Sequence, residues 1–273
     1  MISRCLLAAG LVAATMIPAT AAADDAVGDA PPVDAPRLVA PAKRLVVHAL
    51  LEVNLSKGAA FEPLSLAPDL WYGVNPDLTI GLIHSSQAAT GFLGGVGDGL
   101  CLTGESHGCT GFYDGAGLVG RYHLGDRALI GGAATAALDG GLIAGSFDPF
   151  ALSLKLGAVG RWQRGKLALE AEASLWFGFS QRDAGNIERF YLPLSATYVV
   201  KPRLAVVGQL GVFSPFKGFR AEVVVAMSAG VQYVVRPGII VDAVVSLPHW
   251  LDTDRQTYGL DARTLTFGVG HAF

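Results

Sequence analysis

From Arg44 onward, the chain is composed of short segments in which apolar and polar residues alternate. In the first segment, RLVVHALLEVNL, leucines, valines and an alanine occupy every second position, and His48 and Glu52 lie between them. Alternation with a period of two places the two sets of side chains on opposite faces of an extended strand. The same pattern recurs as far as Phe273 and predicts about twelve strands, each with one apolar face.

The connections between these segments alternate in length. Five are tight and rich in turn-forming residues, and they lie at 75–77, 125–126, 164–165, 201–203 and 236–238. The others are longer and include a glycine-rich loop before Pro149. An even number of strands with the tight turns on one side is typical of an all-β, transmembrane, antiparallel up-and-down β-barrel. A soluble secreted β-sandwich is the alternative fold.

The last segment, TLTFGVGHAF, has one apolar and aromatic face. Leu265, Phe267, Val269 and Phe273 share this face, whereas glycines and threonines occupy the other. The stretch resembles the C-terminal strand of bacterial outer-membrane β-barrel proteins, which is similarly alternating and closes on a terminal phenylalanine. The resemblance implies that Phe273 is an assembly signal for the barrel-assembly machinery. It also implies that outer-membrane lipids and lipopolysaccharide surround the protein.

The composition agrees with a lipid-facing barrel. The chain is 51% hydrophobic and 16% charged, with a mean hydropathy of +0.43. After the N-terminus it has no run of about 18 apolar residues, so the sequence predicts no transmembrane helix. High hydropathy without such a run is expected when only every second residue meets lipid. The net charge of −3 and the lack of a basic stripe argue against nucleic acid as a partner.

The N-terminus has the pattern of an export signal. A positive charge at Arg4 precedes an apolar core and the small-residue stretch ATAAA, so residues 1–23 are predicted to be a cleaved signal peptide. Residues 24–43, rich in proline, alanine and aspartate, are predicted to be a flexible periplasmic leader. Residues 44–273 form the predicted barrel in the outer membrane of a Gram-negative bacterium.

Cleavage of the signal peptide leaves two cysteines, Cys101 and Cys109, in the longest predicted loop. An even pair in an oxidising compartment predicts a disulfide bond. A metal site that also uses Glu105 and His107 is the alternative, but these residues alone do not make a convincing ligand set. The sequence therefore predicts neither a metal nor a cofactor.

The polar face of the predicted strands carries charges of both signs. The predicted lumen-lining residues are Arg44, His48, Glu52, Asp69, Arg121, His123, Lys155, Arg161, Glu170, Glu172, Arg189, Arg220, Glu222 and Asp242. Mixed signs favour ion pairs across the interior over a ring of one charge, which a strongly selective pore would need. Lys155 and Glu172 lie on neighbouring predicted strands and are expected to pair.

Three functions fit this barrel. A narrow passive channel for small solutes is the leading prediction, because about twelve strands enclose more space than the smallest, side-chain-filled barrels. A closed structural barrel is the first alternative, since paired charges can also plug a lumen. A surface-recognition barrel is another, with the cysteine-bearing loop as its binding element.

An enzymatic alternative depends on His84 and Ser86. The stretch HSSQ resembles the His-x-Ser-Asn element of outer-membrane phospholipases and lipid A deacylases, although Gln87 replaces the asparagine. The resemblance implies a lipid hydrolase in which His84 activates Ser86 on the outer wall. Such a mechanism also needs a group that orients the histidine and a donor that stabilises the oxyanion, and the sequence offers no residue in clear register for either.

Overall fold

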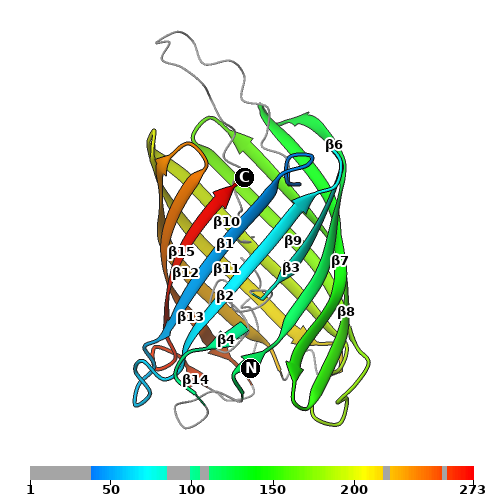
Figure 1. The fold of residues 1–273 in the computed structure, drawn as a ribbon, viewed down its shortest axis with the longest axis vertical. Helices are drawn as coiled ribbons and strands as arrows, with labels where there is room; N and C mark the ends of the chain where they lie inside the picture. Colours follow the sequence, from blue (N-terminus) through cyan, green and yellow to red (C-terminus); the bar gives the residue numbers. More distant parts are fainter. Residues whose placement is uncertain (1–37, 85–98, 105–110, 218–221, 254–256) are drawn as a thin grey trace, which may run out of the picture.

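The computed structural model describes residues 38–84, 99–104, 111–217, 222–253 and 257–273. Twelve long antiparallel strands form one closed sheet (Figure 1). They are β1 (Leu45–Asn54), β2 (Leu64–Gly73), β3 (Leu78–Ile83), β6 (Ala116–Leu129), β7 (Gly132–Phe147), β8 (Phe150–Arg164), β9 (Leu167–Gly178), β10 (Arg189–Lys201), β11 (Leu204–Pro215), β12 (Val224–Arg236), β13 (Ile239–Asp252) and β15 (Thr264–Ala272). Three short segments accompany them: β4 (Gly99–Cys101), β5 (Tyr113–Asp114) and β14 (Thr257–Tyr258).

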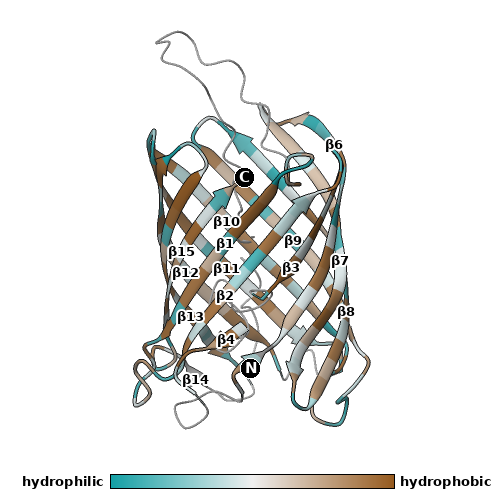
Figure 2. Cartoon of the chain, viewed as in Figure 1, coloured by the Kyte–Doolittle hydropathy of each residue, from teal (hydrophilic) through white to brown (hydrophobic). Residues whose placement is uncertain are grey.

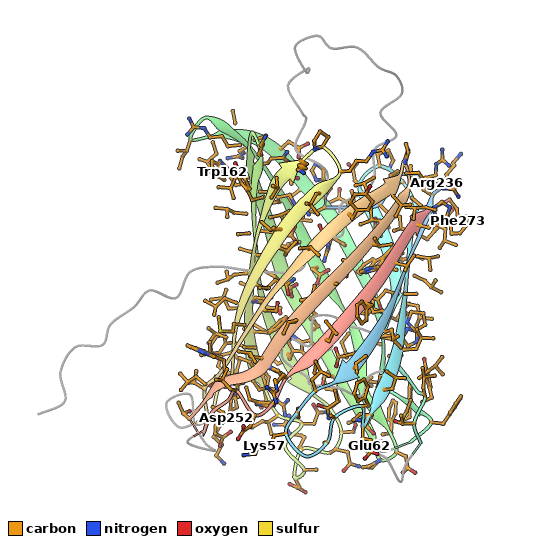
Figure 3. The ribbon with its side chains drawn as sticks, turned by 90° about the vertical axis from the view of Figure 1, so that its left-hand side faces the viewer. Lys57, Glu62, Trp162, Arg236, Asp252 and Phe273 are labelled. Atoms are coloured by element: carbon orange, nitrogen blue, oxygen red, sulfur yellow. The ribbon has the colours of Figure 1, made fainter. Side chains whose placement is uncertain are left out.

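The barrel closes where its first and last strands meet. β1 pairs with β15 on one edge and with β2 on the other, and the long strands otherwise pair in chain order. Trp162, Arg236 and Phe273 lie at one end of the barrel, and Lys57, Glu62 and Asp252 lie at the other (Figure 3). We call these the turn end and the loop end. The predicted antiparallel up-and-down barrel is confirmed.

The outer surface of the wall is apolar. Along most strands, brown apolar residues alternate with paler or teal ones (Figure 2). Leu118 of β6 is 63% exposed and Leu156 of β8 is 50% exposed, whereas Lys155, next to Leu156, is 6% exposed. Leu142, Phe267 and other apolar side chains are exposed in the same way. A continuous apolar exterior on a closed sheet is the surface that a membrane-spanning barrel presents to lipid.

The hairpin of β6 and β7 is longer than predicted, and its turn was placed wrongly. Gly125 and Asp126 lie within β6, where the register shifts between His123 and Gly125. The turn is formed instead by Ile130 and Gly131, whose φ angles are 50° and 68°. Two consecutive positive φ angles are those of a type I′ turn, which suits the twist of a tight hairpin.

Two further boundaries differ from prediction. The glycine-rich stretch before Pro149 belongs to β7, so only Asp148 and Pro149 connect β7 to β8. The connection there is therefore tight, although it lies at the loop end. The strand expected to include Arg220 and Glu222 begins only at Val224.

The wall between β2 and β6 is built from two pieces of chain. β3 pairs with one part of β2 and ends at Ile83. β4 pairs with the next part of β2, with Leu66 opposite Leu100, and so takes the place that a longer β3 would have filled. An added Cβ at Gly99 would lie 3.4 Å from the Cβ of His84, so the chain returns close to where it left. No helix in the described ranges is long and apolar enough to cross a membrane.

The apolar exterior generates a depth-dependent prediction. Leu156→Arg should destabilise the folded barrel by about 2–4 kcal/mol, because it places a charge on the lipid face near the middle of β8. Val235→Arg, next to the turn after β12, is the matched control and should cost about 0–1 kcal/mol. Urea unfolding in lipid vesicles measures both. Equal destabilisation would contradict the assignment of this face to lipid.

Candidate functional site in the barrel interior

Ion pairs connect four neighbouring strands on one side of the interior. Lys155 of β8 contacts Asp139 of β7 at 2.7 Å and Glu172 of β9 at 2.8 Å. Arg121 of β6 donates to Asp139 at 3.1 Å. Arg161 of β8 lies 2.7 Å from the Glu170 carboxylate. We call this set the ion-pair ladder: Arg121, Asp139, Lys155, Arg161, Glu170 and Glu172.

The ladder contains equal numbers of cationic and anionic groups, so its formal charges cancel. The Lys155–Glu172 pair anticipated from the sequence is present. Breaking one buried pair by removing a partner leaves an uncompensated charge, which is strongly unfavourable. Arg121 also lies 5.4 Å from the Trp71 ring centroid, within the range of a cation–π contact. The ladder therefore braces β6 to β9 with fixed side chains.

Asp139 was missed in the sequence, although it joins two cations of the ladder. Its neighbours in AATAALDGG are nearly all small, so this segment lacks the contrast between faces that identified the other strands. The misplaced turn at 125–126 also put Asp139 next to an expected loop. With the turn at 130–131, Asp139 lies opposite Arg121 on β6. A hairpin prediction in this register would have placed Asp139 beside a cation on the polar face.

An apolar cluster occupies the loop-end half of the interior. Its buried members are Ile83, Val119, Ile143, Trp176, Tyr191 and Ala226, with Trp71 and Phe213 packed against them. The rings of Trp176 and Tyr191 meet edge to face, with centroids 6.3 Å apart. The side chains of the cluster come from strands between β2 and β12, so inward side chains from well-separated parts of the wall meet there. It narrows the interior at this level.

The wall from β10 round to β15, next to the ladder strands, carries small neutral residues. Inward positions of β10, β12, β13 and β15 carry serines and threonines, including Ser195, Thr197, Ser228, Ser246 and Thr264, all of which are buried. Ser228 donates a hydrogen bond to Gln209 of β11. Within the described ranges, the hydroxyl groups of Ser195, Thr197 and Thr264 have no hydrogen-bond partner. We call this surface the hydroxyl wall.

His48 and Asp242 connect the two strands on either side of β15. His48 of β1 is aligned with Gly270, and Asp242 of β13 is aligned with Gly268. The His48 Nε2 and Asp242 Oδ1 atoms are 2.9 Å apart. An added Cβ at Gly268 would lie 2.3 Å from Asp242 Oδ1, so the absence of a side chain there lets the contact cross β15. We call the junction of β1, β15 and β13 the closing seam. Gly268 of the last strand thus permits a side-chain contact across this seam.

The other predicted lumen residues lie outside the ladder and the closing seam. Glu52 and Asp69 are buried, and Asp69 accepts a hydrogen bond from the His84 backbone at 2.7 Å. His123 is buried and lies 3.4 Å from Asp126.

Arg189 stacks over Phe213, with its guanidinium carbon 5.2 Å from the ring centroid. Arg44 is exposed just before β1, and Glu222 is exposed before β12, so neither lines the described interior. The reason is that both lie beyond the ends of the paired strands. Arg220 lies outside the described residues.

His84 is buried, whereas the predicted hydrolase needs an accessible histidine on the outer wall. It is 5% exposed, and β3 has already ended at Ile83. Its Nε2 atom lies 2.7 Å from the Tyr113 hydroxyl, and its Nδ1 atom contacts the Pro68 carbonyl. Both ring nitrogens are therefore engaged where the wall passes from β3 to β4. Ser86 lies outside the described residues, so the predicted catalytic pair stays a prediction.

Cys101 ends β4 and is 3% exposed. Its predicted disulfide partner, Cys109, lies outside the described residues, as do Glu105 and His107, and the bond stays a prediction. The described ranges contain no group of three or more His, Cys, Asp or Glu side chains that could hold a metal ion. Residues 1–23, the predicted signal peptide, are also outside the described residues.

The loop between β9 and β10 has its own ion pair. Arg182 donates hydrogen bonds of 2.7 and 3.0 Å to the two oxygens of Glu188. These hydrogen bonds lower the pKa of Glu188. Both side chains are exposed, so the pair contributes little to stability compared with the buried ladder.

Comparisons with known proteins identify the fold. No family model matches the chain, and no curated protein matches its sequence. Among solved structures, the NanC porin has a TM-score of 0.52 at 10% identity, covering 83% of this chain and 98% of that chain.

Omp33 of Acinetobacter baumannii (10% identity, 85% and 98% coverage) and OmpF of Salmonella typhi (11% identity, 84% and 97% coverage) both have TM-scores of 0.41. These two similarities are too low to support an argument. The chain has the porin-like β-barrel fold, as the terminal strand led us to expect.

The ladder predicts an unequal response to two charge-removing substitutions. Asp139→Asn should destabilise the folded barrel by roughly 3 kcal/mol, the lower end of the range for breaking a buried ion pair. Glu172 still compensates Lys155, which keeps the cost near that lower end. Glu188→Gln, which breaks the exposed loop pair, is the control and should cost much less. Urea unfolding compares the two, and a similar loss in both would contradict the bracing role of the ladder.

The closing seam predicts a difference between two neighbouring glycines. Gly268→Ala should displace the Asp242 carboxylate from His48 and destabilise the barrel by about 1.5–3 kcal/mol, the value of a hydrogen bond to a charged group. Gly270→Ala is the control, because its added Cβ would meet His48 at an ordinary 3.6 Å. Thermal unfolding followed by electrophoretic mobility distinguishes the two. Identical transitions would show that the contact across β15 contributes nothing.

Proposed function

We propose that this protein is an outer-membrane channel for passive diffusion of small polar solutes. The hydroxyl wall is the observation that carries the proposal. Ser195, Thr197 and Thr264 are buried, and among the described residues no protein group satisfies their hydroxyls. Buried polar groups are normally satisfied by protein or by water, so a hydrated path along this wall would supply their partners.

The size of the barrel supports the same function. An eight-stranded barrel is just wide enough for its own side chains to fill, and the diameter grows with the number of strands. In this barrel of twelve strands the long side chains of the ladder project from β6 to β9, whereas β10, β12, β13 and β15 carry buried serines and threonines. Space is therefore expected beside the hydroxyl wall.

The interior charges favour weak ion selectivity. The ladder is neutral as a whole, and Arg189 is outnumbered by the remaining inward carboxylates Glu52, Asp69 and Asp242. A strongly selective pore instead concentrates one sign of charge at a constriction. A small preference for cations is the expected behaviour, and neutral solutes should also pass.

A closed structural barrel is the second candidate, and the apolar cluster favours it. Ile143 is 1% exposed and Trp176 is 6% exposed, so this part of the interior excludes solvent effectively. If the cluster extends across the whole lumen, no solute can pass. Conductance measurements separate the two candidates directly.

The channel predicts a defined effect of one bulky substitution. Ser195→Trp should reduce single-channel conductance in planar bilayers, because it fills space beside the hydroxyl wall. Ala196→Trp is the matched control, since the neighbouring residue points to the other face and should leave conductance unchanged. In a salt gradient the parent protein should show a small reversal potential, with the sign that indicates preferential passage of cations. Absence of current from the folded parent protein would refute the function.

A further inference from the structure

The chain immediately before β1 turns into the barrel at the turn end. In Figure 1 it is the dark blue hook above β1. Leu38 and Val39 are 8% and 4% exposed, although residues 24–43 were predicted to form a flexible leader. Leu38 packs against Ala137 of β7 and Val159 of β8. Both of these are inward-facing positions of the wall.

Polar contacts hold the same segment along its length. The Arg121 guanidinium donates a hydrogen bond of 3.2 Å to the Leu38 carbonyl. The Ala40 backbone donates one of 2.7 Å to the Thr79 hydroxyl of β3. Ala42 forms a parallel bridge with Gly73, the last residue of β2. Residues 38–42 are thus held by several different strands.

Gly73 is shaped to receive this segment. An added Cβ at Gly73 would lie 2.1 Å from the Pro41 carbonyl oxygen and 2.7 Å from that of Ala40. Backbone atoms this close cannot coexist with a side chain, so the segment passes directly over the glycine. The absence of a side chain at position 73 is therefore required for residues 40 and 41 to lie where they do.

We infer that residues 38–42 are an internal restriction of the channel, which narrows its turn-end mouth by occupying space against β2, β3, β6, β7 and β8. This inference rests on the proposed channel function. The segment is joined to the barrel by a few hydrogen bonds and by the packing of Leu38 against Ala137 and Val159. Arg121 is shared between the Leu38 carbonyl and Asp139. Its contacts can therefore be broken without removing any strand of the wall.

The position of the segment can be tested without any measurement of transport. Leu38→Cys in the folded full-length barrel should react slowly with a membrane-impermeant thiol reagent, because position 38 is buried. Lys43→Cys, at an exposed position of the same stretch, is the control and should react fast. The parent protein gives the background from Cys101 and Cys109. Equal rates at positions 38 and 43 would overturn the inference.

A point substitution tests whether Gly73 holds the segment. Gly73→Ala, added to Leu38→Cys, should raise the labelling rate towards that of Lys43→Cys, because the new methyl group displaces residues 40 and 41. Gly160→Ala is the matched control, since an added Cβ there meets nothing nearer than the Thr135 carbonyl at 3.9 Å. Heat-modifiable electrophoretic mobility verifies that each variant is folded. Continued protection in folded Gly73→Ala would overturn the inference.

Conductance then tests the restriction itself. Deletion of residues 24–42 should give a larger single-channel conductance than deletion of residues 24–37, which leaves the contacting segment in place. Equal currents from the two proteins would overturn the restriction alone. Absence of current from both would overturn the channel function, and this inference with it, so the two failures are distinguishable.

Discussion

The structure depends on closure of the sheet. A strand at an open edge exposes a row of unpaired backbone groups, and within a hydrocarbon layer water cannot satisfy them. β15 meets this requirement because it pairs with β13 on one edge and with β1 on the other. Glycines on its inner face then allow His48 and Asp242 to meet across it. The terminal strand is therefore both the last element of the wall and the centre of its seam.

Closure divides the residues into two environments with opposite requirements. The outer face needs only apolar surface, which alternating leucines, valines and aromatic residues supply. The inner face gathers the buried polar side chains of the strands, and these include the ion-pair ladder on β6 to β9 and the hydroxyl wall on β10 to β15. The ladder holds six of the charges that are expensive to leave unpaired, and His48 and Asp242 meet separately across β15. The hydroxyl wall keeps small hydroxyl groups that water or a polar solute can satisfy.

The sequence was sufficient to predict the strand number and the faces, because alternation is a local signal that lipid reinforces on every strand. Turn positions were predicted less accurately. Gly125 and Asp126 have the residue types of a hairpin turn, yet β6 continues past them through an irregularity in its pairing. Asp139 was not predicted to face the interior, because its neighbours are small residues that show no alternation of apolar and polar positions. The burial of Leu38 and the engagement of His84 depend on contacts with distant strands, so no local pattern could reveal them.

Solute entry into vesicles tests the central claim most directly. Vesicles containing the folded, purified protein should swell in isotonic solutions of small neutral solutes, at rates that fall as solute size increases. Protein-free vesicles, and vesicles with heat-denatured protein, provide the baseline. The account predicts faster entry of the smallest solutes than this baseline, with exclusion of larger ones. Swelling no faster than the baseline for every solute would show that the interior is closed, and would contradict the account.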